Sequence, residues 1–102
     1  MSLSEIYFNY NKAMEQADEL DDVAGRLAGA ADRDMENILS EVGSAWRSDS
    51  SAQYLQKGRK VKGDLHTTAG NLRNIASAIR TIARRIRDAE LEAWRIANER
   101  RN

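Results

Sequence analysis

LHTTAGNLRNIASAIRTIARRIRDAELEAWRI, residues 65–96, repeats its apolar side chains with a period of seven residues. One set of positions recurs every seven residues, and a second set follows each member of the first by three. The first set is Leu65, Leu72, Ile79, Ile86 and Ala93, and the second is Thr68, Ile75, Ile82, Ala89 and Ile96, with Ala69, Ala76 and Ala83 widening the stripe. Such a repeat is typical of a long helix packed on another helix. It predicts one helix from about residue 51 to about residue 100.

The first half of the chain carries a second apolar stripe with helical spacing. Ser2 and Glu5 have the spacing of a capping box, so we expect a helix to begin near residue 3. The apolar positions then alternate in steps of four and three, except for one additional four-residue step that shifts the phase. They are Ile6, Tyr10, Ala13, Ala17, Leu20, Ala24, Leu27 and Ala31, followed by Met35, Ile38 and Val42. The stripe predicts a helix over about 3–42, closed by Gly43 in a left-handed conformation.

The stretch between the two stripes, residues 43–50, has the composition of a turn. Ser50 and Gln53 form a second capping box ahead of the second helix. A short connection places consecutive helices antiparallel, which pairs residues whose numbers add up to about 95. We therefore expect an all-α fold, with residues 1–102 forming a single domain built as an antiparallel two-helix hairpin.

The charge distribution favours the same arrangement. Residues 1–45 hold 10 acidic and 3 basic side chains, whereas residues 46–102 hold 13 basic and 6 acidic ones, although the formal net charge is zero. Halves of opposite sign attract one another when they fold together, even though each exposed pair contributes only about 0 to 1 kcal/mol.

Both helices carry more apolar positions than one helix–helix contact covers, so we expect the hairpin to dimerise into a four-helix bundle. The absence of net charge leaves no overall repulsion, which favours a homodimer. The residues expected in packing or dimer contacts are Leu20, Leu27, Gly25, Gly29, Leu65, Leu72, Ile75, Ile79, Ile82 and Ile86. Gly25 and Gly29 either permit close contact with a partner helix or are tolerated surface glycines, and the sequence leaves both interpretations open.

The residue inventory argues against an enzyme. The chain has no cysteine and a single histidine, His66, so neither a metal site nor a nucleophile paired with a base can be assembled. We expect no catalytic residue, no cofactor and no metal. The acidic run at residues 18–22 is expected to be solvated surface, and His66 is expected at the edge of the stripe.

Other ligand classes are also disfavoured. The arginines of the second half resemble a phosphate-binding surface, but the acidic first helix beside them offsets their field, so we expect no nucleic acid. No stretch approaches the roughly 18 apolar residues of a membrane span, so we expect no stable membrane insertion. The start of the sequence lacks the pattern of a secretory signal, so any export would follow another route.

Two tryptophans stand at the ends of the predicted hairpin. Trp46 lies in the turn, where it either folds back over Leu39, Val42 and Tyr54 as a plug or serves as a recognition aromatic. Trp94 lies beyond the start of the first helix, where it either packs on the nearby aromatics at residues 7–10 or marks a recognition segment.

The turn and the overall layout resemble the WXG family of ESAT-like proteins of type VII secretion systems. Trp46-Arg47-Ser48 stands where that family has Trp-Xaa-Gly, and Tyr54 matches the aromatic usually found eight residues later. The resemblance covers the whole chain in length, hairpin layout and heptad pattern. Ser48 in place of glycine resembles a divergent branch, such as the small helical partners that accompany LXG-type toxins.

The resemblance implies a non-enzymatic secretion protein, either a small exported substrate or a targeting partner of a larger LXG-type toxin. Its implied partners are a second copy, a related helical hairpin or such a toxin, and the ATPase of the secretion machinery. It implies a cytoplasmic protein that is then secreted without a signal peptide. The family's export signal is an aromatic followed four residues later by an acid, and Trp94, Asn98 and Glu99 lie nearest to that pattern. The alternative is a dimeric coiled-coil adaptor unrelated to secretion.

Overall fold

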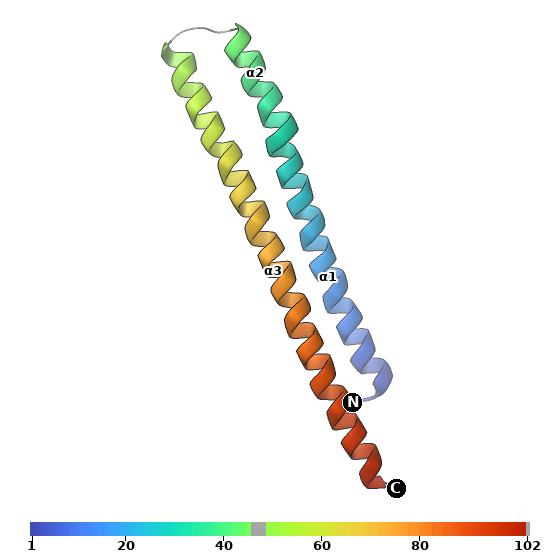
Figure 1. Cartoon of the computed structure of the whole chain (residues 1–102). Helices are drawn as coiled ribbons and strands as arrows, with labels where there is room; N and C mark the ends of the chain where they lie inside the picture. Colours follow the sequence, from blue (N-terminus) through green and yellow to red (C-terminus); the bar gives the residue numbers. More distant parts are fainter. Residues whose placement is uncertain (46–48, 102) are drawn as a thin grey trace. The chain divides into compact units, whose positions relative to one another are not determined.

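The computed structural model describes residues 1–45 and 49–101, and nearly all of them are helical (Figure 1). The chain forms helix α1 (Leu3–Gly29), the π-helical segment η1 (Ala30–Met35), helix α2 (Glu36–Ala45) and helix α3 (Asp49–Arg101). No strand occurs in the described ranges, so the predicted all-α class is confirmed. The chain divides into two compact units: unit 1 is Met1–Asp21 with Asn74–Asn102, and unit 2 is Asp22–Arg73.

The first helix begins where the sequence predicts. The backbone N–H of Glu5 donates to Oγ of Ser2 at 3.2 Å, and the N–H of Ile6 donates to the carbonyl oxygen of Ser2 at 3.1 Å. A helix start leaves four N–H groups without partners, and the side chain of Ser2 satisfies that of Glu5, while the bond from Ile6 is the first regular bond of the helix. Ser2 therefore caps α1.

The segment η1 accounts for the phase shift in the apolar pattern. Ala17, Ala24 and Ala31 are buried at intervals of seven, whereas the next buried residue, Leu39, comes eight residues later. A π-helical turn bonds residue i to residue i+5 and so takes up one extra residue. Gly29 and Glu36 on either side keep ordinary helical φ and ψ angles. The helix thus continues through η1 while its apolar positions stay on one face.

The predicted turn is too long at both ends. Residues 43–45 belong to α2, and α3 begins at Asp49 instead of near residue 51. No described residue, Gly43 included, has a positive φ, so the prediction that Gly43 closes the helix in a left-handed conformation is wrong. Glycine can adopt helical angles at a cost of about 1 kcal/mol relative to alanine, so its place after a stripe does not by itself stop a helix. Trp46, Arg47 and Ser48 lie outside the described residues, as does the side chain of Ser50.

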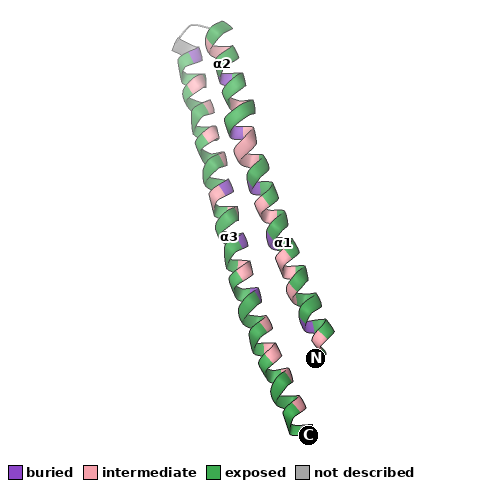
Figure 2. Cartoon of the chain, turned by 45° about the vertical axis from the view of Figure 1, so that its right-hand side comes forward, coloured by how far each residue is buried: buried purple, intermediate pink, exposed green. Residues whose placement is uncertain are grey.

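Within each unit, part of α3 lies alongside an earlier segment that runs in the opposite direction (Figures 1 and 2). In unit 1, Arg80 bonds to Asp18 and Arg87 lies over the ring of Tyr10. In unit 2, Lys62 bonds to Glu36. The residue numbers of these pairs add up to 97 or 98, close to the predicted total of about 95.

The buried residues of each unit, purple in Figure 2, are mainly alanines. Unit 1 buries Ile6, Ala17, Ala76 and Ala83, and unit 2 buries Ala24, Ala31, Leu39 and Ala69, together with Ser51. The second apolar set of α3 does not lie at the centre of these contacts. Its members, Thr68, Ile75, Ile82, Ala89 and Ile96, are all exposed. Small side chains allow the two backbones to approach, so the alanines take the centre and turn the isoleucines to one side.

Candidate interaction surfaces

An ionic flank borders the helix contact on one side in unit 1. Nη2 of Arg80 donates to Oδ1 of Asp18 at 2.7 Å and to Oδ2 of Asp21 at 2.6 Å. These hydrogen bonds, with that to Asp18 the stronger cause, raise the pKa of Arg80 above its usual value. The acidic run is therefore not merely solvated, because two of its carboxylates bind a cation of the facing helix.

The ionic flank has a counterpart in unit 2. Nζ of Lys62 donates to Oε2 of Glu36 at 2.9 Å, and Nε2 of His66 lies 2.7 Å from Oδ1 of Asp32. His66 is exposed, at the edge of the contact as predicted. In both units α3 supplies the basic partner and the earlier segment the acidic one. The opposite charges of the two halves thus meet as specific ion pairs.

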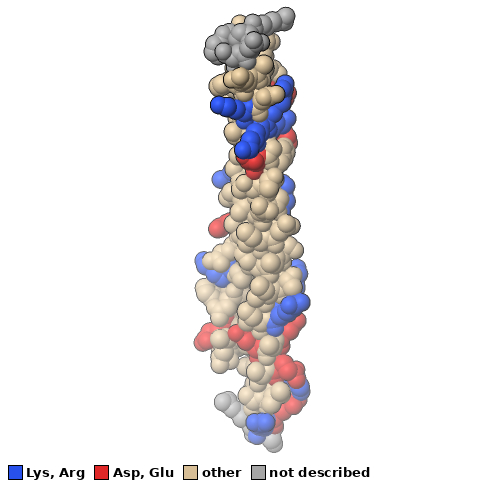
Figure 3. All heavy atoms as spheres, turned by 90° about the vertical axis from the view of Figure 1, so that its left-hand side faces the viewer, with Lys and Arg blue, Asp and Glu red and all other residues tan. Residues whose placement is uncertain are grey.

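The other side of α3 is an apolar flank. Ile75, Ile82 and Ile86 of unit 1 are 50%, 54% and 52% exposed. Figure 3 shows a long area without charged side chains on the face that carries α3. Clustered exposed apolar side chains mark interaction sites more often than single ones do. We refer to the half-exposed apolar side chains on this side of α3 as the apolar flank, namely Ile75, Ile82 and Ile86 in unit 1 and Tyr54 and Val61 in unit 2.

Unit 2 adds a groove beside the apolar flank. The groove has a volume of about 240 Å³ and is lined by Met35, Ile38, Leu39, Tyr54, Lys57, Gly58 and Val61. Gly58 forms its floor because the side chain of Leu39 occupies the space in which a Cβ atom at residue 58 would lie. Ile38 and Tyr54 are about half exposed, at 47% and 52%. The groove is thus an apolar surface with one lysine at its rim.

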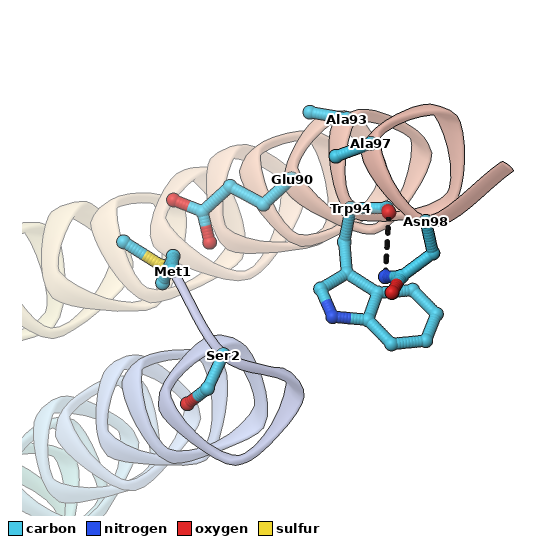
Figure 4. Close-up of a pocket in the computed structure, with 7 residues that line it drawn as sticks. All are labelled: Met1, Ser2, Glu90, Ala93, Trp94, Ala97 and Asn98. Atoms are coloured by element: carbon cyan, nitrogen blue, oxygen red, sulfur yellow. Dashed lines mark hydrogen bonds between the residues drawn. The ribbon is translucent and has the colours of Figure 1, made fainter. Parts of the chain in front are cut away.

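A second pocket lies in unit 1, between the start of α1 and the last turns of α3 (Figure 4). It has a volume of about 410 Å³ and is lined by Met1, Ser2, Glu90, Ala93, Trp94, Ala97 and Asn98. The indole of Trp94 is half-buried and lies beside the amide of Asn98, which donates to the carbonyl oxygen of Trp94 at 2.9 Å. The aromatics at residues 7–10 do not line this pocket, because Tyr7 and Phe8 are exposed and Tyr10 faces Arg87 at 4.5 Å.

The residues nearest to the export pattern are held by bonds within α3. The amide of Asn98 is engaged with the backbone, and the carboxylate of Glu99 pairs with Arg95. Arg95 also pairs with Glu92 through two of its nitrogens, which lowers the pKa of that carboxyl. The last turns of α3 therefore present an indole and an ion-paired cluster.

The remaining predicted contact residues divide into two groups. Leu20, Leu27, Leu65, Leu72 and Ile79 are half-buried along the contact within the units. Gly25 is exposed, with no atom within 4 Å of the place that a Cβ atom would take, and Gly29 neighbours only the side chain of Arg33. Neither glycine therefore serves a close helix contact within the described chain. Gly58, which does, was missed because its spacing from other small residues gave no signal.

The described residues hold no group of three or more histidine, cysteine or acidic side chains arranged to bind a metal ion. Three of the arginines considered for phosphate binding are engaged with carboxylates, namely Arg80, Arg87 and Arg95. None of the described helices combines the length and the apolar character that crossing a membrane requires. No protein-family model, curated protein or solved structure matches this chain.

Proposed function

We propose that the chain is an antiparallel helical hairpin that associates through its apolar flank into a four-helix bundle and acts as a non-enzymatic protein of type VII secretion. In this role it is either a small exported substrate or a targeting partner of a larger LXG-type toxin. The observation that carries the binding role is the exposure of Ile75, Ile82 and Ile86 on one side of α3. Isoleucines that are half exposed in one chain are covered when a second helical pair packs on them.

The secretion role is supported by the sequence around the turn. Trp46-Arg47-Ser48 and Tyr54 have the order and spacing of the WXG element. Tyr54 is exposed at the groove of unit 2, where a partner can reach it. The half-buried Trp94 lies in the pocket at the end of α3, which is the second surface suited to a secretion partner.

The test is export and partner capture by variants of the two tryptophans. Trp94→Ala and Trp46→Ala are compared with wild type for appearance in the culture medium and for pull-down of a co-expressed LXG-type toxin or secretion ATPase. Phe8→Ala is the matched control, since it removes an exposed aromatic outside the pocket. We expect loss of export or capture with a tryptophan variant and not with the control. Folded tryptophan variants that behave as wild type would remove the secretion role.

The second candidate function is a dimeric coiled-coil adaptor outside secretion. It is favoured by Asn98, which stands where the export pattern has an acid and whose amide is bonded to the backbone. Genes for a secretion ATPase or an LXG-type toxin beside the gene of this chain would favour the secretion role over the adaptor.

A further inference from the structure

Glu90 is an acid in the inward row of α3 in unit 1. The row, spaced by seven residues, starts there with Ala76 and Ala83, which are both buried. Glu90 comes next and is half-buried at the pocket between the start of α1 and the last turns of α3 (Figure 4). Its carboxylate forms no hydrogen bond or ion pair with any described residue. An acid that is partly removed from water without a partner lowers stability, so its place in this row indicates a role in binding.

The polar side chains that line this pocket provide acceptors. Among its seven lining residues, all of them described, Glu90 alone has a charged side chain. The amide nitrogen of Asn98 donates to the carbonyl oxygen of Trp94, which leaves the amide oxygen open to a donor. Oγ of Ser2 already accepts a bond from the N–H of Glu5. The pocket therefore fits a ligand with a positive charge and several N–H donors.

Trp94 gives the pocket an aromatic wall beside this acid. Residues four apart on a helix are neighbours on one face, so the indole lies next to the side chain of Glu90 along α3. The face of an indole attracts a cation more strongly than other aromatic rings do. A guanidinium group is planar, stacks on a ring and donates two parallel bonds to a carboxylate, whereas an ammonium group has no such fork. An arginine side chain is thus the cation that uses both groups, and Ala93 and Ala97 leave room for its aliphatic stem.

Unit 1 already holds one guanidinium group in this way. Arg87 lies 4.5 Å from the centre of the Tyr10 ring, and its Nε donates to Oδ1 of Asp88 at 3.0 Å. Trp94 follows Arg87 by seven residues, so at the next step of the same row α3 supplies the aromatic ring in place of the cation. Glu90 supplies the acid. The pocket thus repeats the combination of ring and acid without a guanidinium group from the described chain.

We infer that Glu90 and Trp94 bind the side chain of an arginine from a partner protein. Charge complementarity selects this occupant, because the pocket is acidic and the neighbouring Arg87 and Arg95 are already paired with acids of α3. The inference goes beyond the proposed function, since it depends neither on the secretion role nor on the apolar flank. It adds the chemistry that a partner must present to this end of unit 1.

The test is an NMR titration of the full chain with a short peptide that carries one arginine and has blocked ends. We expect saturable shifts of the Trp94 indole N–H and of the backbone amides of residues 90–98. The same peptide with citrulline, which keeps the shape of arginine without its charge, should bind about tenfold more weakly. A lysine peptide should bind about threefold more weakly, because it lacks the planar fork. Absence of saturable binding at millimolar arginine peptide, or equal binding of the citrulline peptide, would overturn the site, and equal binding of the lysine peptide would overturn the assignment to arginine.

Variants of the two residues assign the binding to this pocket. Glu90→Gln should weaken the arginine peptide about tenfold, and Trp94→Leu, which keeps apolar bulk, about two- to fivefold. Glu92→Gln is the matched control, because it removes the same charge from a carboxylate outside the pocket, and it should change the affinity by less than about twofold. Binding by Glu90→Gln that equals wild type would overturn the inference.

Urea unfolding of Glu90→Gln separates binding from folding. Because the carboxylate has no partner to lose, the urea midpoint of the variant should equal or exceed that of wild type. A clearly lower midpoint would show that Glu90 supports the fold instead, and would also overturn the inference.

Discussion

At the scale of single residues, glycine and alanine decide how closely the helices approach. Leu39 is 5% exposed and lies in the space beside Gly58, so this glycine is needed for packing. A Cβ atom at Gly63 or Gly70 would meet nothing within 4 Å apart from the backbone of its own turn of helix, so these glycines give no packing gain within the chain. Substitution by alanine should therefore change the free energy of unfolding in opposite directions at these two kinds of glycine.

The variant Gly58→Ala should therefore destabilise the fold, and Gly63→Ala should stabilise it. Overpacking against Leu39 costs about 1 to 3 kcal/mol and outweighs the gain of about 1 kcal/mol in helix propensity. At Gly63 a methyl group meets no facing side chain, so only the gain of about 1 kcal/mol in helix propensity applies. Urea unfolding of both variants at matched concentration measures the difference. A stabilised Gly58→Ala would mean that Leu39 moves aside freely.

Arg80 is the side chain that ties two carboxylates across the contact of unit 1. Arg80→Gln should lower the thermal midpoint more than Arg84→Gln does, because Arg84 is exposed and forms no ion pair with the described residues. The loss should shrink in high salt, which screens exposed charges. Equal midpoints for the two variants in low salt would show that the Arg80 pairs add nothing to stability.

At the scale of elements, η1 compensates for one extra residue. Without the π-helical turn, the face of α2 would rotate by about 100°, and Ile38 instead of Leu39 would follow the buried Ala31 on the inward face. The turn thus places Leu39, which is 5% exposed, on the inward face and leaves Ile38 47% exposed.

Deletion of Arg33 should convert η1 to regular α-helix and leave the apolar positions in phase. We expect the free energy of unfolding to stay within about 1 kcal/mol of wild type, as for a surface change. Deletion of Glu15, the control, leaves α1 with no compensating turn and should cost several times more. Hydrogen exchange and urea unfolding of the two deletions make the comparison. A similar loss for both would refute this role of η1.

The last turns of α3 should respond to acid through Glu92. Its pKa is lowered in the folded chain by Arg95, so this contribution to stability is present above the unfolded pKa. It is lost as the pH falls through the folded value. Helix content of residues 92–100, followed by NMR, should therefore decrease in that acidic range. In Arg95→Ala the decrease should be smaller, and an unchanged profile would argue against the pair.

At the scale of the whole molecule, the chain exposes more apolar surface on α3 than a contact within either unit covers. If a second copy covers that surface, stability depends on protein concentration, because association adds to the stability of the folded form.

Ile75→Asp tests this dependence. A carboxylate in the apolar flank should prevent association, because association would bury the charge. We expect the wild-type thermal midpoint to rise with concentration and the midpoint of the variant to remain constant. Asn74→Asp places the same charge on the preceding exposed residue, outside the apolar flank, and is the control. A wild-type midpoint independent of concentration would contradict the association.

The element types followed from the sequence because helical periodicity is a local property. The start at Leu3 was legible in the capping box of Ser2 and Glu5, and the long second helix and the extra residue near Ala31 were legible in the spacing of apolar residues. The ends at Ala45 and Asp49 were not, because a glycine and a run of serines are compatible with helix as well as with turn.

Which side of the stripe faces inward depended on packing between distant segments. The heptads of α3 contain three adjacent apolar rows, and the spacing alone does not say which one lies at the centre. The alanine row took the centre because only small side chains let two backbones approach closely, and the ion pairs of Asp18, Asp32 and Glu36 lie along one side of it. Helix formation depends on the local sequence. Which row of the helix faces inward depends on which surfaces of two distant segments pack most closely.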